Sequence, residues 1–414
     1  MKNIIIRNSN RFKSVFVSVN LLLPLRADET SKNALLAMVL KKNNGLYKKE
    51  IELERTLARL YNTTIGVSVE KVDNIYNISF GAEMLNVKYL TKQGVNEVID
   101  IIYNIIKNPN FIHGTFDKET FELEKLSLIQ KIAEERDDKK KYALNGLEKE
   151  MFVGTEYGSA SLGTIEQVEK ITNEELVEHY NKVMKEAEIK VIAVGNLHDM
   201  EDMPYELHNK ICGEGGKNHI ENVKDVEKEP SDEIQVKIEE QDINQSVLCI
   251  GLRFLNMKKE EIYKAMLFNA ILGGTPASKL FQNVREKESL AYFSKATYNR
   301  HKNVIYMFSG IAPEKYEKAK QVMLEQVEAI KNADITDIEI NAAKQSLVSA
   351  YREIQDSKAS QAKNIFSNAI FFEKEISFEE IIENIEKLTK QDVVEIAAKV
   401  KATNIFLLGG KVNA

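Results

Sequence analysis

Residues Leu272–Tyr292 read LGGTPASKLFQNVREKESLAY, and the rest of the chain is best interpreted outward from this stretch. The pair Gly273-Gly274, followed by Pro276, predicts that one helix ends and another begins, because glycine terminates helices and proline is tolerated only in their first turn. Apolar side chains at helical spacing predict the second helix over Ser278–Lys287. A strand is then expected to begin near Tyr292.

Arg285 and Tyr292 are the two residues of this stretch that suggest chemistry. One lies near the predicted end of the helix and the other near the start of the strand, seven residues later. Placed in this way they can meet in space and offer a charged fork and a phenol to a peptide carbonyl. The alternative is structural: the arginine caps the helix and the tyrosine belongs to the core.

The whole stretch resembles the signature of the C-terminal domain of insulinase-type metallopeptidases, a family that includes the mitochondrial processing peptidase and its bacterial relatives. That signature has the form LGG…S…LF…VREK…LAY. The resemblance implies that Arg285 and Tyr292 match the family's Arg/Tyr pair, which binds the substrate backbone near the scissile bond. Ser289 departs from the pattern, because the family usually has glycine there.

Composition is typical of a globular protein with two domains. The chain has 414 residues, 43% hydrophobic and 29% charged, and a net charge of −6, which argues against nucleic acid as a partner. Two cysteines, Cys212 and Cys249, are too few for a disulfide framework, so a cytoplasmic location is expected. The apolar segment Ser14–Leu25 alternates with period two and is predicted to be a strand, not a signal peptide. No apolar run is long enough to span a membrane.

The order of predicted elements repeats along the chain. Ser127-Leu128 recurs as Ser346-Leu347, and Lys182-Val183 recurs as Lys399-Val400 at nearly the same offset, which indicates an internal duplication. We therefore predict an α+β protein with an N-terminal domain over 1–210, a linker over 211–232 and a C-terminal domain over 233–414. The family resemblance implies that each half is a mostly antiparallel sheet with helices on one face.

The zinc motif that the family carries, His-x-x-Glu-His, is absent. The matching helix, predicted over Lys32–Lys42, has Asn33, Leu36 and Ala37 at the positions of the family's His, Glu and His. Leucine and alanine offer no metal ligand and no base. We therefore expect no cofactor in this chain, and zinc only in a partner.

Two weaker motifs lie near the linker. His208, Cys212 and His219 are close in sequence, but a solvated linker explains them better than a metal site. Residues 213–217, GEGGK, resemble a phosphate-binding loop but lack its first glycine and its final Ser or Thr.

The favoured hypothesis is a catalytically inactive subunit of a heterodimeric zinc metallopeptidase. In it, Arg285 and Tyr292 would bind a peptide substrate at the active site of a homologous, zinc-motif-bearing partner. The alternative is a structural or binding scaffold of the same fold with no role in proteolysis. A stand-alone peptidase is disfavoured because no nucleophile–base constellation stands out. Homodimers of the isolated chain are also expected to be possible, as the family resemblance implies.

Overall fold

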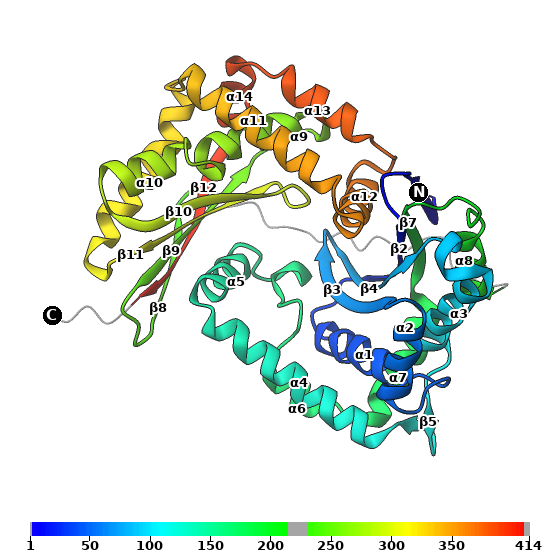
Figure 1. Ribbon diagram of the computed structural model, residues 1–414. Helices are drawn as coiled ribbons and strands as arrows, with labels where there is room; N and C mark the ends of the chain where they lie inside the picture. Colours follow the sequence, from blue (N-terminus) through cyan, green and yellow to red (C-terminus); the bar gives the residue numbers. More distant parts are fainter. Residues whose placement is uncertain (1, 214–230, 410–414) are drawn as a thin grey trace. The chain divides into compact units, whose positions relative to one another are not determined.

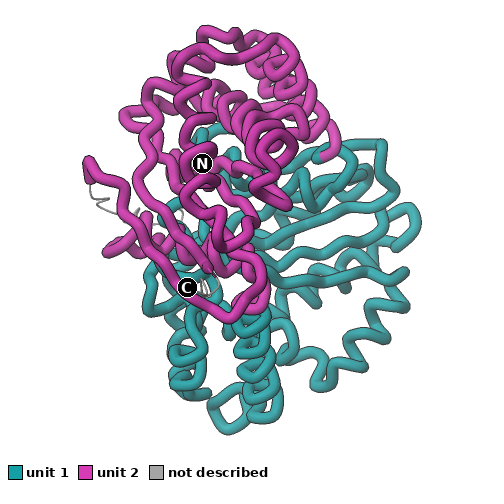
Figure 2. Tube along the Cα trace, turned by 90° about the vertical axis from the view of Figure 1, so that its left-hand side faces the viewer, with its two compact units in different colours: residues 1–134, 159–225, 354–374 teal, residues 135–158, 226–353, 375–414 magenta. Residues whose placement is uncertain are grey.

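The computed structural model describes residues 2–213 and 231–409. The chain divides into two compact units: unit 1 contains residues 1–134, 159–225 and 354–374, and unit 2 contains residues 135–158, 226–353 and 375–414 (Figure 2). Each unit therefore contains one segment from the other half of the sequence. Most of the predicted linker, residues 214–230, lies outside the described residues, as do His219 and most of the GEGGK segment.

The sheet of unit 1 has five strands in the order β1-β7-β2-β4-β3 (Figure 1). Only the β1–β7 pair is parallel. The strands of unit 1 are β1 (Ile4–Asn8), β2 (Ser14–Pro24), β3 (Thr64–Val72), β4 (Ile75–Leu85), β7 (Glu188–Gly195) and the short pair β5 (Phe111–Ile112) and β6 (Thr115–Phe116). The helices that begin in unit 1 are α1 (Thr30–Lys42), α2 (Glu50–Arg59), α3 (Val87–Lys107), α4 (Lys118–Asp137), α6 (Ile165–Lys170), α7 (Asn173–Glu186), α8 (Met203–Cys212) and α12 (Lys358–Phe372).

The sheet of unit 2 has the equivalent order, β8-β12-β9-β11-β10, again with one parallel pair, β8–β12. Its strands are β8 (Gln235–Glu240), β9 (Ser246–Phe254), β10 (Ala291–Asn299), β11 (Val304–Ile311) and β12 (Val400–Gly409). Its helical segments are α5 (Lys139–Met151), η1 (Glu156–Gly158), η3 (Lys259–Glu261), α9 (Ile262–Asn269), η4 (Ala270–Gly274), η5 (Leu280–Lys287), η6 (Pro313–Lys315), α10 (Tyr316–Lys331), α11 (Asp337–Ile354), α13 (Phe378–Glu386) and α14 (Lys390–Ala397). Two mostly antiparallel sheets packed with helices confirm the predicted fold class.

The second face of the unit 1 sheet is covered by α12, which comes from the other half of the sequence. Ile365 and Phe366 of α12 lie in one apolar cluster with Leu22 of β2. At the polar edge of this contact, Lys358 Nζ lies 3.0 Å from Glu83 Oε1. Because both faces are covered, nearly every residue of β2 is buried, in both of the sets that alternate along the strand.

Helix α5 has the corresponding place in unit 2. It contacts β9 and β12, and the Arg253 guanidinium of β9 donates a hydrogen bond to the Met151 carbonyl at its end. The hydroxyl of Tyr306 on β11 donates to Glu148 Oε2 of α5 at 3.0 Å. Helices were predicted on one face of each sheet. The structure adds one helix on the opposite face, α12 in unit 1 and α5 in unit 2.

The core of unit 2 packs helices α9, α10, α11 and α14 against the sheet. The Gly-Gly turn predicted from sequence lies here. A Cβ on Gly273 would lie 2.4 Å from the Ala296 backbone nitrogen of β10, so only glycine allows this approach of helix to strand. Within the described residues, no helix combines the length and the apolar character that crossing a bilayer requires.

Candidate functional site

The positions of the family's zinc motif lie inside the core of unit 1. Asn33, Leu36 and Ala37 are on α1 and are all buried, with Leu36 and Asn33 showing no exposed surface. The helix contacts α3, α6 and α7 and the strands β3 and β4, so it is enclosed on several sides. Leu36 fills apolar space where a peptidase of the family needs a carboxylate.

Asn33 is paired with a histidine that the sequence analysis did not assign to this site. His179 Nε2 lies 2.8 Å from Asn33 Oδ1, a buried contact between residues 146 apart in sequence. Burial lowers the pKa of His179 to about 4, so the imidazole is neutral at physiological pH. A neutral imidazole with hydrogen on Nε2 donates this bond, while Asn33 Nδ2 has no hydrogen-bond partner among the described residues.

The position of His179 follows from the helix that carries it. Thr172 and Glu175 form a capping box at the start of α7, and the buried face of the helix is made by Leu176, His179, Tyr180 and Val183. His179 thus occupies a place in an apolar stripe. A histidine at such a place is the sequence signal that could have identified a buried partner on a neighbouring helix.

These residues do not fit a zinc ion. The pair Leu36 and Ala37 supplies no donor atom, and the remaining polar pair, Asn33 and His179, is closed by its own hydrogen bond. Across residues 2–213 and 231–409, no group of three His, Cys, Asp or Glu side chains is arranged to hold a metal ion. His208 and Cys212 are neighbours on α8, with Nε2 and Sγ 3.4 Å apart, but they form no such group.

Arg285 lies on η5, which winds as a π-helix over Leu280–Lys287 where an ordinary helix was predicted. Leu280 and Val284 face the core, and the buried Lys279 just before the segment binds Glu339 of α11 at 3.0 Å. Single turns of this wide helix often occur at functional sites. The guanidinium of Arg285 lies over the Phe281 ring, 4.6 Å from its centre, and its Nε is 3.5 Å from Glu286 Oε1.

Tyr292 lies in a β-bulge at the start of β10. Ala291 pairs with Ile311 and Phe293 pairs with Gly310, so Tyr292 is the extra residue of the bulged strand. Its side chain is 71% exposed, against the interpretation that it belongs to the core. A Cβ on Gly310 would lie 2.4 Å from the Phe293 ring, so the glycine makes room for this ring beside the bulge.

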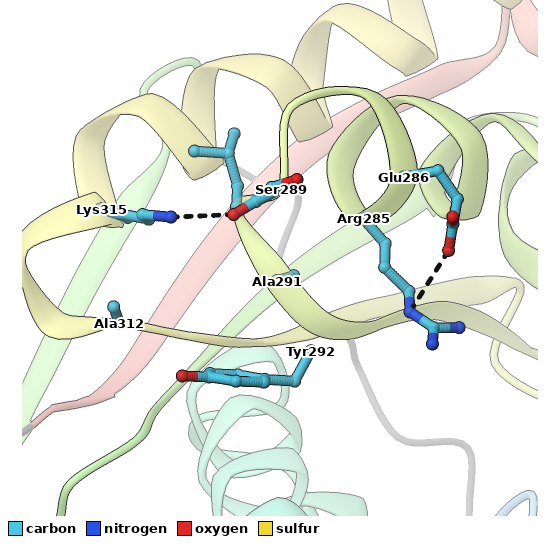
Figure 3. Close-up of a pocket in the computed structure, with 8 residues that line it drawn as sticks. Arg285, Glu286, Ser289, Ala291, Tyr292, Ala312 and Lys315 are labelled. Carbon is cyan, nitrogen blue, oxygen red and sulfur yellow. Dashed lines mark hydrogen bonds and ion pairs between the residues drawn. The ribbon is translucent and has the colours of Figure 1, made fainter.

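Arg285 and Tyr292 line the same cavity, of about 420 Å³. The other lining residues are Glu286, Ser289, Leu290, Ala291, Ala312 and Lys315. Figure 3 shows the phenol extending beneath Ala312 while the guanidinium extends toward the opposite side, so the two polar ends point apart. The structure therefore brings both residues to one cavity, but the guanidinium and the phenol hydroxyl do not meet.

The two units share one α+β architecture. Unit 1 has no metal ligand at Leu36 or Ala37 of α1, and unit 2 presents an exposed Arg285 and Tyr292. Residues 170–347 match the family described as Peptidase M16 inactive domain. The chain is 28% identical to the probable inactive metalloprotease YmfF of Bacillus subtilis over 97% of this chain and 94% of the relative.

Two crystal structures have a similar fold. A conserved protein from Enterococcus faecalis gives a TM-score of 0.90 with 24% identity, covering 99% of this chain and 97% of that one. The peptidase M16 inactive domain from Pseudomonas fluorescens gives a TM-score of 0.78 with 16% identity, covering 99% and 95%. The chain is thus similar in sequence and in fold to proteins described as inactive members of the M16 peptidase family.

Proposed function

We propose that this chain is the non-catalytic subunit of a heterodimeric M16-type zinc metallopeptidase that processes peptides. A homologous partner with an intact His-x-x-Glu-His motif would supply the zinc, the base and the water. This chain would supply Arg285 and Tyr292. The single observation that carries the proposal is the exposure of Tyr292 at a bulge beside Arg285, in a cavity of about 420 Å³.

The chemistry of the two side chains supports binding of a peptide backbone. A guanidinium presents several donors in a fixed plane, and a phenol can donate to a carbonyl oxygen or accept from an amide. Donors directed at a carbonyl stabilise the negative charge that develops on its oxygen during hydrolysis. Arg285 and Tyr292 would thus bind the substrate on either side of the bulge and assist the partner's chemistry.

The proposal also covers location and assembly. Both cysteines are free, Cys249 buried and Cys212 half-buried, which suits a reducing compartment such as the cytoplasm. We further propose that the isolated chain can form homodimers when its partner is absent. Size-exclusion chromatography of the chain alone and of the mixture distinguishes these states.

The decisive experiment mixes the purified chain with a homologue from the same genome that carries the zinc motif. Each protein alone and the mixture are assayed on a library of fluorogenic peptides. We expect activity only in the mixture. Activity of the lone chain, or a partner that is fully active alone and gains nothing on mixing, would contradict the proposal and favour the scaffold alternative.

Two variants then test the assigned residues in the active mixture. Arg285→Ala is expected to lower kcat/KM by roughly 100-fold, the effect of removing one oxyanion donor, and Tyr292→Phe by about tenfold. Tyr205→Phe is the matched control, because Tyr205 is another exposed tyrosine but lies on α8 in unit 1. If Arg285→Ala and Tyr292→Phe both behave like the control, the cavity is not the substrate site.

A further inference from the structure

The turn between η5 and β10 has an unfavourable backbone conformation. Ser289 has φ of 48°, in the left-handed region that glycine adopts readily and other residues avoid. The resemblance of this stretch to the insulinase-type signature places glycine at this position. A serine here must be held by surrounding contacts, because the conformation costs roughly 1–2 kcal/mol for a residue with a Cβ.

Lys315 contacts this residue through its side chain. Its Nζ donates a hydrogen bond to the Ser289 carbonyl oxygen at 2.8 Å (Figure 3). The backbone on both sides of Ser289 is also tied to η5, through Glu288 N to Asn283 O and Leu290 N to Val284 O. The lysine is therefore the side-chain element of a turn that otherwise depends on backbone hydrogen bonds.

The place of Lys315 in the fold connects this contact to Tyr292. Lys315 ends the short helix η6, which directly follows β11, and β11 is the strand that pairs with β10 across the bulge. The Tyr292 side of the bulge is thus bounded by two features: the ladder to β11 on one side and the turn at Ser289 on the other. Lys315 connects the two, because it lies on η6 just after β11 and its Nζ bonds to the Ser289 carbonyl oxygen.

We propose that Lys315 is a positioning residue: by holding the Ser289 carbonyl it fixes the turn and the bulge, and thereby the direction of the Tyr292 side chain. The expected effect of Lys315 on peptidase activity rests on the proposed function. Its effect on the orientation of the Tyr292 side chain concerns the folded chain alone and does not depend on that function. Lys315 acts through Tyr292 and not by contacting the substrate.

The first test needs no partner and no substrate. The chain contains no tryptophan, so Tyr292→Trp introduces a single indole at an exposed position. In this background we compare the fluorescence anisotropy and acrylamide quenching of Lys315→Met, Lys315→Arg and Lys318→Met. Lys318 is an exposed lysine three residues away and is the matched control.

Lys315→Met is expected to lower the anisotropy and raise the quenching constant by about twofold, while Lys315→Arg and Lys318→Met leave both near the parent value. Circular dichroism of each variant confirms that the fold is retained. Equal anisotropy in Lys315→Met and Lys318→Met would overturn the proposal, whatever the outcome of the peptidase assay.

The second test uses the active mixture. Lys315→Met is expected to lower kcat by about tenfold, Lys315→Arg to restore most of it, and Ser289→Gly to reduce the loss caused by Lys315→Met, because glycine adopts the left-handed conformation without help. A loss that is the same in the Ser289 and Gly backgrounds, and that appears only with acidic peptides, would show that Lys315 contacts the substrate and would contradict the positioning role. If the mixture is inactive throughout, the anisotropy measurements alone decide the inference and the proposed function fails separately.

Discussion

The zinc-motif positions of unit 1 and the cavity of unit 2 differ in how far their side chains are buried. On α1, the residues at those positions have become core: Leu36 is fully buried and Asn33 is hydrogen-bonded to His179. In unit 2, Tyr292 remains largely exposed and Arg285 lines a cavity. The difference teaches that the side chains at the zinc-motif positions contribute more to the stability of the fold than Tyr292 does. The proposed binding role concerns only the second region.

The difference has a simple energetic basis. A buried position is filled most favourably by apolar or paired side chains, because an unpaired polar group in the core costs several kcal/mol. Leu36 meets this condition fully, and Asn33 meets it through Oδ1 but not through Nδ2. A surface position is under no such constraint. Tyr292 is exposed at a bulge and is therefore expected to contribute little to stability. The following predictions test this contrast, from the largest expected change in the free energy of unfolding to the smallest.

The largest effect is expected for Leu36→Glu, which restores the carboxylate of the family's motif without its metal. Burying an unpaired charge at a fully enclosed position should lower the free energy of unfolding by more than about 4 kcal/mol, measured by urea denaturation. Ile338→Glu on α11, at a residue 76% exposed, should change it by less than about 0.5 kcal/mol. If Leu36→Glu costs as little as its control, α1 retains a polar pocket and the contrast is wrong.

The second effect is the pH dependence that His179 gives to the free energy of unfolding. Its pKa of about 4 in the folded chain lies below the ordinary value of 6.5, so between these pH values the unfolded chain binds a proton that the folded chain does not. The free energy of unfolding should therefore fall as the pH is lowered from 6.5 to 4, by up to about 3 kcal/mol, and level off below. In His179→Gln this part of the decrease should vanish.

Unfolding in urea at pH 7 and at pH 4.5 measures this decrease for each variant. The exposed His198 provides the control, and His198→Gln should retain the full decrease. An unchanged pH dependence in His179→Gln would mean that the imidazole is already solvated in the folded chain.

The smallest effect is expected in the unit 2 cavity. Tyr292→Ala should change the free energy of unfolding by less than about 0.5 kcal/mol, because an exposed side chain loses few contacts. Arg285→Ala should cost up to about 1 kcal/mol, because its guanidinium is stacked on Phe281. Thermal unfolding of both variants measures this. A loss of several kcal/mol in Tyr292→Ala would sharpen the case for a structural role and weaken the assignment to substrate.

Much of this contrast could be predicted from local sequence. The strand at β2, the helix at α1 and the loss of donors at Leu36 and Ala37 each follow from side-chain type and periodicity over a few residues. The turn at Gly273 and the helix that carries Arg285 follow in the same way, although the π-helical form of η5 does not. These features depend on interactions between residues close in sequence, which a pattern can report.

Other features depend on residues far apart in sequence and could not be predicted. The edge strands β1 and β8 pair in parallel with β7 and β12 from the far ends of their halves, and neither was predicted. The contact of His179 with Asn33 crosses 146 positions, and the contact of Lys315 with Ser289 crosses 26. The additional helix on each sheet was also missed, although the apolar residues on both faces of β2 indicate such a cover.

Helices α5 and α12 make each unit depend on the opposite half of the sequence. A chain cut between residues 213 and 231 would give two fragments, each of which leaves one apolar sheet face bare. Neither fragment is expected to be soluble alone, and the two together are expected to recover the native state by complementation. Because each unit is completed by a helix from the opposite half of the sequence, two copies of the chain could exchange α5 or α12 and form a domain-swapped dimer that keeps the same contacts.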